Sequence, residues 1–541
     1  MQQFQGQGLG GQASEASKVQ ILSRAYDQAM DRINRQSAGL KELATRVLAW
    51  ITCANWPLTV LELQHALAVE LEEPEMDEEN LVDVETMVSV CSGLVRVDDE
   101  STIIRLVHYT TQEYLERTQT TWFPDAEADI ALVCMAYLSM IRDWRSIPSL
   151  PFYPYALLNW NLHAPKAPGI SQQIADFLMH ADWVLGETLY ALNAVAARGV
   201  ERYRREKDKN SWRLDRLQDT HITGMHWAAY RGWDSILRIL LERAGDPDAQ
   251  NGNGATPLMW AAWKGRETTV ELLLATEGVN AGHRDRRGDT PLSKAAAYGQ
   301  EGVVKLLLAN EFVDPDTVDI RGRTPLWRAM LPVSMSWATT SESDATAAAL
   351  LATGRVDVNV RYRGPFQATP LCWAAENRRD RLVELLLAAG ADPDMTDDWG
   401  MTPLSRAARS RNRAVAERLI ATGNVDVDAR DSYGWTPLRH AARNGCVGIV
   451  ELLLATGGVQ AGRKDARGRT ALSWAAESGH ADVVELLLDT EGVDPNDADD
   501  EGKTPLAWAV ANDHDAVADL LLMHGVVDLP TRTAKVRSDS M

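Results

Sequence analysis

Residues that could carry out chemistry are few and scattered in this chain. Gly6, Gly8 and Gly11 fit the Gly-x-Gly-x-x-Gly pattern of a dinucleotide loop, but five preceding residues cannot supply the strand that such a loop must follow. The five cysteines are widely separated and never spaced as metal-binding pairs, which is typical of reduced intracellular thiols. No phosphate loop, nucleophile elbow or zinc-binding His-Glu-x-x-His motif occurs. The sequence therefore predicts no enzymatic activity, no metal and no cofactor.

A repeated phrase dominates the second half of the sequence. Each copy has a threonine, usually followed by Pro-Leu, then one or two small residues and, further on, an aliphatic triplet. The copies begin at Thr223, Thr256, Thr290, Thr324, Thr369, Thr402, Thr436, Thr470 and Thr504. Successive steps are 33 or 34 residues, apart from one step of 45. A period this regular predicts a solenoid of stacked helical units.

The second unit shows how one copy is expected to fold. Thr256 can cap a helix whose first residue is Pro257, and Gly265 can end that helix. A second helix then presents an aliphatic stripe that includes Val270 and Leu273. Each such side chain contributes about 1.5 to 3 kcal/mol when it is fully enclosed. One unit cannot enclose its own stripe, so neighbouring units must stabilise each other.

The phrase resembles the ankyrin repeat, with nine units over residues 218–530. The first unit departs from the pattern with Gly224 in place of proline, as expected of a terminal cap, and the eighth has Ala471 there. The fourth unit carries about eleven extra residues around 332–344. We interpret these as a polar surface loop, with a hinge and modification site as the alternative.

The region before the repeats has the signals of a winged helix over residues 21–120. Helical apolar spacing runs from Val19 to Ile51, and a further helix is expected near Leu81 to Val90. Thr59 with Glu62, and Thr110 with Glu113, are expected to cap two other helices. Two short strands, 94–97 and 102–107, complete the pattern.

The remaining boundaries follow from composition and apolar spacing. Residues 1–20 are rich in Gln and Gly and are expected to be disordered, as is a tail over 531–541. Residues 121–217 are expected to form a helical connector. The overall prediction is a mostly α protein: a winged helix, a helical connector and an ankyrin-repeat solenoid.

Charge argues against nucleic acid and membrane as partners. The formal net charge is −21, and the segment from Glu70 to Glu85 contains nine acidic residues and no Lys or Arg. DNA phosphates would be repelled by this part of the winged helix. The N-terminus lacks the features of a secretion signal and no apolar run approaches a membrane span. We therefore expect a cytoplasmic protein, with the nucleus as a second compartment.

A second resemblance covers the stretch from Leu48 to Leu115, including the turn Cys91-Ser92-Gly93-Leu94-Val95 and the strand end Leu106-Val107-His108-Tyr109. It is similar to the winged-helix region that follows the NACHT domain in fungal NLR-like proteins ending in ankyrin repeats. The resemblance implies a nucleotide-sensing role for His108, with a buried histidine at a strand–helix junction as the alternative. The NACHT domain itself is missing, so the chain is either a truncated relative or a fragment of a longer gene.

Ankyrin arrays resemble one another in binding partners through the turns between repeats and the concave, exposed face of the first helices. Counted from each threonine, these are positions −4, −3, −1, +7 and +8. They hold eleven basic and seven acidic residues, a net charge of +4 on a chain of −21. Arg and aromatic residues dominate interface hot spots. The predicted partner-binding residues are Tyr230, Arg231, Trp263, Lys264, Arg287, Tyr298, Arg321, Arg323, Trp399, Arg409, Tyr433, Trp435, Arg443, Arg467 and Arg469.

This set predicts a protein or peptide partner with an acidic, partly apolar surface. The alternative interpretation is that charged side chains occur in these turns simply because the turns are exposed to solvent. Position +4 holds Trp227, Trp260 and Trp474 in some units and Arg328 or Arg406 in others. We expect packing between units there, or else a shallow groove of cation and ring contacts.

Two functions remain open at this point. In the first, the chain is an interaction protein, the sensor half of an NLR-like signalling protein. In the second, it is a regulatory subunit whose winged helix docks on a separate NACHT-type ATPase, with His108 completing the nucleotide site in trans.

Overall fold

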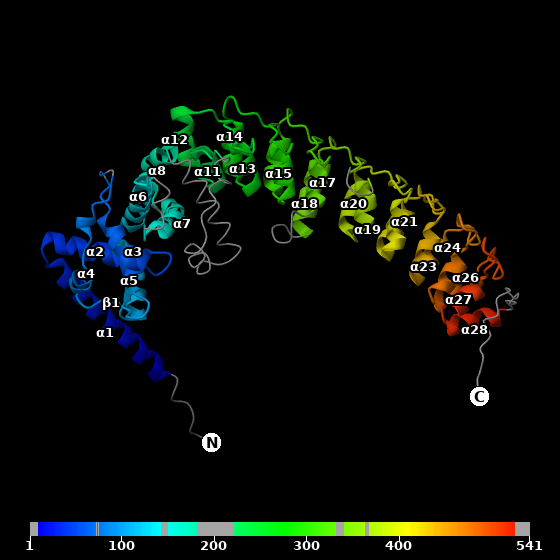
Figure 1. Ribbon diagram of the computed structural model, residues 1–541, viewed down its shortest axis with the longest axis horizontal. Coiled ribbons are helices and arrows are strands. Elements are labelled where there is room, and N and C mark those ends of the chain that lie inside the picture. The colour runs from blue at the N-terminus through cyan, green and yellow to red at the C-terminus, as the bar shows by residue number, and fades with distance from the viewer. Residues whose placement is uncertain are drawn as a thin grey trace, which may run out of the picture. The chain divides into compact units, whose positions relative to one another are not determined.

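The computed structural model is mostly α-helical (Figure 1). The residues that it describes are 9–71, 73, 75–141, 150–180, 221–331, 340–362 and 367–524. The chain divides into two compact units, which are described separately below: residues 1–261 with 272–279, and residues 262–271 with 280–541. Across the described residues, every helix is too short or too polar to cross a membrane.

The first unit contains the expected winged helix. The hairpin pairs β1 with β2 antiparallel, with Val95 opposite Leu106 and Val97 opposite Ile104. A bridge from Thr59 to Ile103 adds the position of a third strand. Thr59 and Glu62 form the predicted capping box. The elements are α1 (Leu9–Asn34), α2 (Ala38–Cys53), α3 (Val60–Ala68), the 3-10 helix η1 (Glu78–Asn80), α4 (Val84–Val90), β1 (Val95–Val97), β2 (Ile104–Leu106) and α5 (Tyr109–Trp122).

Two local expectations in this unit are wrong. Helix α1 begins at Leu9, so the predicted disorder through residue 20 does not hold. Extending a helix costs little once its later turns are fixed, and Met30 and Ile33 of α1 are buried. The closing helix α5 is capped by His108, whose Nδ1 accepts from the backbone N–H of Thr110 at 3.2 Å. Thr110 and Glu113 therefore lie inside the helix and not at its cap.

The described part of the connector packs against the first repeat. The Trp160 ring of α7 lies 6.0 Å from that of Trp227 and 5.8 Å from that of Trp233. A Cβ atom on Gly224 would lie 2.6 Å from the carbonyl oxygen of Leu178, so contact with α8 explains why glycine replaces proline there. Residues 142–149 and 181–217 of the predicted connector lie outside the described residues. Its elements are α6 (Ala126–Ser139), α7 (Tyr153–His163), η3 (Ala164–Lys166), η4 (Pro168–Ile170) and α8 (Ser171–His180).

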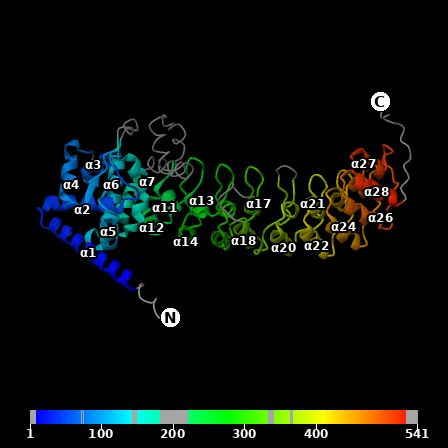
Figure 2. The same ribbon diagram turned by 90° about the horizontal axis from the view of Figure 1, so that it is seen from below.

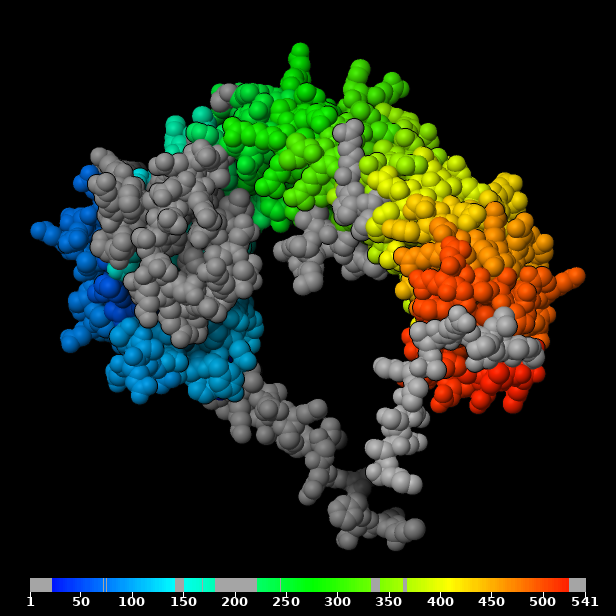
Figure 3. All heavy atoms as spheres, turned by 45° about the vertical axis from the view of Figure 1, so that its right-hand side comes forward, coloured from blue at the N-terminus to red at the C-terminus, as the bar shows by residue number. Residues whose placement is uncertain are grey.

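Among the residues that the structure describes, nine helical hairpins follow, as the repeat phrase predicts. In the second unit the first helices of successive hairpins lie side by side in one row, and the second helices lie in another (Figure 2). From α21 to α28 they form one continuous close-packed body (Figure 3). The helix pairs are α11 (Gly224–Arg231) with α12 (Asp234–Ala244), α13 (Pro257–Lys264) with α14 (Glu267–Leu274), α15 (Pro291–Ala297) with α16 (Glu301–Leu308), α17 (Pro325–Met330) with α18 (Thr340–Leu351), α19 (Pro370–Glu376) with α20 (Asp380–Ala388), α21 (Pro403–Arg409) with α22 (Arg413–Ala421), α23 (Pro437–Arg443) with α24 (Val447–Ala455), α25 (Ala471–Glu477) with α26 (Ala481–Leu488), and α27 (Pro505–Ala511) with α28 (Asp515–Met523).

The repeat threonines are helix caps, as expected. The Thr290 hydroxyl accepts from the backbone N–H of Ser293 at 3.1 Å, and Thr402 does the same for Ser405 at 3.2 Å. Because proline lacks an N–H that would need a partner, Pro291 suits the first helical position.

The polar insertion of the fourth repeat is not all loop. Residues 332–339 lie outside the described residues, but α18 begins at Thr340. Ser343 is buried and donates to the carbonyl of Ala329 at 2.6 Å, and Asp344 forms an ion pair with Arg379 at 2.5 Å. Ser343 is therefore part of the packed helix pair, so modification of its hydroxyl would require the helix to open.

Candidate recognition surface

The turn before each repeat is called the finger, and in six repeats an aspartate five residues before the threonine holds it. In the finger before Thr436, Asp431 Oδ1 accepts from the backbone N–H groups of Tyr433 at 2.9 Å and Trp435 at 2.8 Å. Sequence reasoning missed this residue, although its recurrence five places before the threonine was a usable signal. The finger aspartates are Asp285, Asp319, Asp397, Asp431, Asp465 and Asp499.

Adjacent fingers are joined at their tips by backbone hydrogen bonds. Ser432 N donates to Trp399 O at 2.8 Å, and Ile320 N donates to Arg287 O at 2.9 Å. The same bond, from position −4 to position −3 of the preceding finger, recurs at Ala466 and Asp500. The bonds use the backbone of position −3 and leave its side chain available for other contacts.

The second carboxylate oxygen of the finger aspartate meets the side chain at position +4 of the same repeat. His440 Nε2 lies 3.0 Å from Asp431 Oδ2, and the indole N–H of Trp474 donates to Asp465 Oδ2 at 3.1 Å. The side chains at position +4 therefore pack inside the array, as expected. In these two repeats they also donate a hydrogen bond to the finger aspartate. A satisfied buried carboxylate avoids a large desolvation cost.

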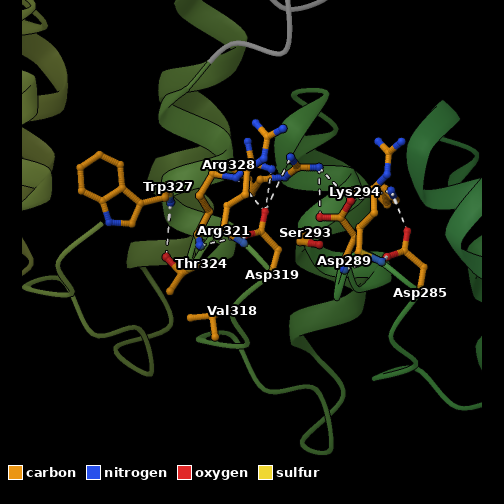
Figure 4. A network of polar contacts seen from close by, with 12 residues as sticks. Asp285, Asp289, Ser293, Lys294, Val318, Asp319, Arg321, Thr324, Trp327 and Arg328 are labelled. Carbon is orange, nitrogen blue, oxygen red and sulfur yellow. Dashed lines mark hydrogen bonds and ion pairs between the residues drawn. The ribbon is translucent and has the colours of Figure 1, made fainter. Parts of the chain in front are cut away.

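In the third and fourth repeats these contacts join into a charged ladder (Figure 4). Lys294 Nζ lies 3.0 Å from Asp285 and 2.7 Å from Asp289. Arg328 lies 3.1 Å from Asp289 and 4.0 Å from Asp319, linking the two repeats. Burial alone would raise the pKa of Asp319, but hydrogen bonds from its neighbour Arg323 lower it. The predicted partner residue Arg323 is therefore engaged with Asp319, at 2.7 Å, inside the array.

In the last repeats, rings and guanidinium groups alternate. Arg439 lies against the rings of Trp435 and Trp474, and Arg469 lies 3.5 Å from the Trp474 centroid and 4.1 Å from that of Trp508. Arg469 is 4% exposed, so this predicted partner-binding residue is packed inside the array and not on its exposed face. It immediately precedes the cap Thr470, at the base of the finger, where side chains point toward the position +4 column.

Arg439 is 3% exposed, and burial lowers its pKa to about 8. Its Nε lies 3.1 Å from Asp465 Oδ2, yet none of its guanidinium nitrogens makes a hydrogen bond with good geometry to a described residue. Ring faces and the nearby carboxylate therefore hold this charge mainly by electrostatic attraction.

The predicted partner-binding residues separate into three groups. Arg231, in the first repeat, donates a hydrogen bond to the backbone carbonyl of Asn161 at 3.0 Å, so its side chain also holds the connector against this repeat. Half-buried members are Tyr230, Arg231, Trp263, Lys264, Tyr298, Arg323, Trp399 and Trp435, and Arg469 is buried. The exposed members are Arg287, Arg321, Arg409, Tyr433, Arg443 and Arg467.

Several of these residues line one hollow in the second compact unit, residues 262–271 with 280–541. The hollow has a volume of about 560 Å³. It lies between the fingers and first helices of the sixth to eighth repeats. The Trp435 and Trp474 rings are 5.3 Å apart at its side. We call it the aromatic–arginine hollow, and its lining residues include Trp399, Arg409, Tyr433, Trp435, Arg443, Arg467 and Trp474.

His108 lies far along the chain from this hollow, at the N-terminus of α5. It is exposed, which is contrary to the buried alternative, and its Nδ1 is 2.8 Å from the Thr110 hydroxyl. The ring lies 4.4 Å from that of Tyr109.

In the described parts of the chain, no cluster of three or more His, Cys, Asp or Glu side chains is arranged to hold a metal. Burial raises the pKa of the Cys53, Cys91 and Cys372 thiols to about 12. A thiol must lose its proton to act as a nucleophile, so burial disfavours the reactive form of these cysteines.

Two protein-family models match the chain. The model described as ankyrin repeats, in three copies, matches residues 194–285, 269–332, 371–465 and 449–531, which together are more than half of the chain. The model described as the winged helix domain of GPI inositol-deacylase matches residues 30–132. The second match extends to α6, beyond the end at residue 120 that we expected.

Proposed function

The chain belongs to the ankyrin-repeat family, whose arrays mediate protein–protein interactions, and we propose that this array binds the acidic, partly apolar surface of a partner protein. The binding residues are the exposed ones at the finger tips and on the first helices. The chain acts by recognition, without a reaction of its own.

The observation that carries this proposal is a difference between two sets of charged side chains, one buried and paired within the array and the other exposed. Arg328, Arg406 and Asp397 are buried and paired with each other or with their neighbours. In contrast, Arg409, Arg443 and Arg467 are exposed, and form no ion pair within the described residues. Side chains that do not hold the array together are free to contact a partner, and arginine is a frequent interface hot spot.

The winged helix and connector support a more specific role, that of the sensor half of an NLR-like signalling protein in the cytoplasm. The stacked rings of Trp160 and Trp227 join the connector to the first repeat, and Arg243 of α12 forms an ion pair with Asp176 of α8. A rigid joint of this kind suits a protein in which binding to the repeats is communicated to another domain.

The test is capture of partners from a native extract by the full-length chain and by a finger-tip variant. The variant carries Arg287→Ala, Arg321→Ala, Tyr433→Ala and Arg467→Ala, all at position −3. We expect capture to be lost while the thermal midpoint stays within about 2 °C of wild type, since exposed substitutions change stability little. A control, Arg238→Ala with Arg381→Ala on second helices, removes two exposed positive charges elsewhere, compared with three in the finger-tip variant. Equal capture by all three proteins would rule the proposal out.

The exposure of His108 favours one second candidate, a regulatory subunit that docks on a separate NACHT-type ATPase. His108 caps α5 with Nδ1, and a ring nitrogen at a helix N-terminus suits an anionic phosphate. Co-purification with such an ATPase, lost on His108→Ala but kept by the finger-tip variant, would support this role. An ATPase that co-purifies equally with both variants would exclude His108 from it.

A further inference from the structure

The aromatic–arginine hollow has an unbalanced charge. Arg409, Arg443 and Arg467 line it and are exposed. Asp431 is the one carboxylate among its described lining residues, and its Oδ2 lies 3.0 Å from His440 Nε2. Burial lowers the pKa of His440, although the carboxylate of Asp431 opposes this. The three arginines therefore lack a carboxylate partner in the described residues, and the hollow attracts an anion.

Its walls are apolar as well as positive. Trp399, Tyr433, Trp435 and Trp474 contribute ring surface, and Tyr433 is 59% exposed. Arg443 lies 5.3 Å from the Trp435 centroid and 5.1 Å from that of Trp474. Contacts with ring faces keep the guanidinium plane near the wall while its N–H edge can still bind a carboxylate.

A buried guanidinium lies behind the ring walls of the hollow. Arg439 lies between the rings of Trp435 and Trp474, both of which line the hollow, and is 3% exposed. Its Nη1 and Nη2 make no hydrogen bond to a described residue. Its Nε lies 3.1 Å from Asp465 Oδ2, so this carboxylate offsets its charge, and the attraction for an anion comes from the exposed arginines.

From these features we infer that the hollow binds an acidic peptide segment in which a carboxylate lies beside a large apolar side chain. The carboxylate contacts Arg409, Arg443 and Arg467, and the apolar side chain packs on Trp435 and Trp474. This inference rests on the proposed function and names the chemistry that the sixth to eighth repeats select. The volume of about 560 Å³ falls within the roughly 300–1,000 Å³ typical of ligand clefts.

A polyanion without apolar groups fits less well. The net charge of −21 repels an extended polyphosphate at long range, and the ring walls would remain uncovered. A short peptide presents little charge at a distance and covers both kinds of wall.

The test uses the full-length chain and a fluorescein-labelled peptide of alternating aspartate and phenylalanine, followed by fluorescence anisotropy. Two control peptides replace every aspartate by asparagine or every phenylalanine by serine. We expect each control to bind at least about tenfold more weakly, a difference of about 1.4 kcal/mol. Equal binding of the serine control would overturn the apolar contact, and equal binding of the asparagine control would overturn the carboxylate contact.

The protein variant is Arg409→Gln with Arg443→Gln, and its matched control is Arg238→Gln with Arg381→Gln, which changes the net charge equally. We expect the first to weaken peptide binding at least about tenfold and to reduce its salt dependence, with the control within about twofold of wild type. Equal weakening by both would indicate a long-range charge effect and overturn the site. Displacement of the peptide by single-stranded RNA or by inorganic phosphate would also overturn it.

Different results would contradict the proposed function and the chemistry assigned to the hollow. If the peptide does not bind but the finger-tip variant still loses capture from extract, only the chemistry assigned to the hollow is wrong. If the finger-tip variant captures partners normally, the proposed function is wrong.

Discussion

Arg406 shows that residue type alone does not reveal whether a charged side chain in this array stabilises the fold or contacts a partner. It is 1% exposed, and its Nε donates to Asp397 Oδ2 at 2.7 Å while its Nη1 donates to Glu376 at 2.7 Å. Asp397 in turn holds its finger through the N–H groups of Trp399 and Met401. A single arginine therefore stabilises the turn that presents Trp399.

Removing either Arg406 or Asp397 leaves the other charge buried without this ion pair. We predict that Arg406→Leu lowers the free energy of unfolding by about 3–5 kcal/mol. The double variant Arg406→Leu with Asp397→Asn costs at least about 1 kcal/mol less than the sum of the two single changes, because the carboxylate is neutralised as well. Urea denaturation of the four proteins measures this coupling. Additive costs would show that the two side chains do not interact.

His226 makes the first repeat sensitive to acid. Its Nε2 lies 2.8 Å from the carbonyl oxygen of Ala255, and its Nδ1 lies 3.3 Å from the N–H of Thr223, so the neutral ring fits both. Burial lowers its pKa from 6.5 to about 4. Between these values the unfolded chain binds the proton and the folded chain does not, so stability falls as pH falls from 6.5 towards 4. Above pH 6.5 both states are neutral and the effect vanishes.

We predict that α11 and α12 lose about 2 kcal/mol of stability between pH 6.5 and 5, since one pKa unit corresponds to about 1.4 kcal/mol. Hydrogen exchange of their amides, corrected for intrinsic rates, reports the change. His226→Gln keeps a donor and an acceptor but does not titrate, so its loss over the same range is smaller. Identical pH dependence of the two proteins would exclude His226 as the cause.

At the scale of elements, the first helix of every repeat except the fourth, whose corresponding residue lies outside the described part of the chain, is followed by a residue with left-handed backbone nine places after the cap threonine. Gly265, Gly299 and Gly445 take this conformation without strain, with φ between 66° and 73°. In two other repeats the same place is held by Arg378 (φ 57°) and Arg411 (φ 61°). A side chain there costs roughly 1–2 kcal/mol.

Arg378 is exposed, so it offers a direct measurement of this strain. We predict that Arg378→Gly raises the free energy of unfolding by up to about 1 kcal/mol, once the greater freedom of glycine in the unfolded chain is subtracted. Arg378→Ala retains Cβ and gives no such gain. A destabilised glycine variant would show that the arginine side chain makes stabilising contacts that outweigh the strain.

The helical hairpins and their caps were predictable because threonine, proline and aliphatic residues recur at fixed spacing. The direction of the side chain at position −1 was not predictable. It depends on the hydrogen bonds that Asp431 and its equivalents accept from the backbone, which place Trp435 and Arg469 against side chains at position +4. The starts of α1 and α18 were missed for another reason. Their sequences are polar. The start of α18 is held by contacts of Ser343 and Asp344, and α1 begins as an extension of a helix whose later residues Met30 and Ile33 are buried.

At the scale of the whole molecule, the chain separates maintenance of the fold from recognition. Aliphatic stripes such as Val303, Leu307 and Leu386 are buried between hairpins, and the charged and ring ladders close the fingers. The exposed arginines and Tyr433 remain for a partner. The hollow was only partly predictable, since its residues were identified singly and their convergence depends on how three successive repeats stack.

The most direct test of this account is a hydrogen-exchange footprint of the full-length chain with and without its captured partner. The account predicts protection of the fingers 397–401, 431–435 and 465–469 and of helices α21 and α23, with the second helices α22, α24 and α26 unchanged. Protection confined to the second helices would contradict it, because the partner would then bind the side of the array that carries neither the finger tips nor the hollow.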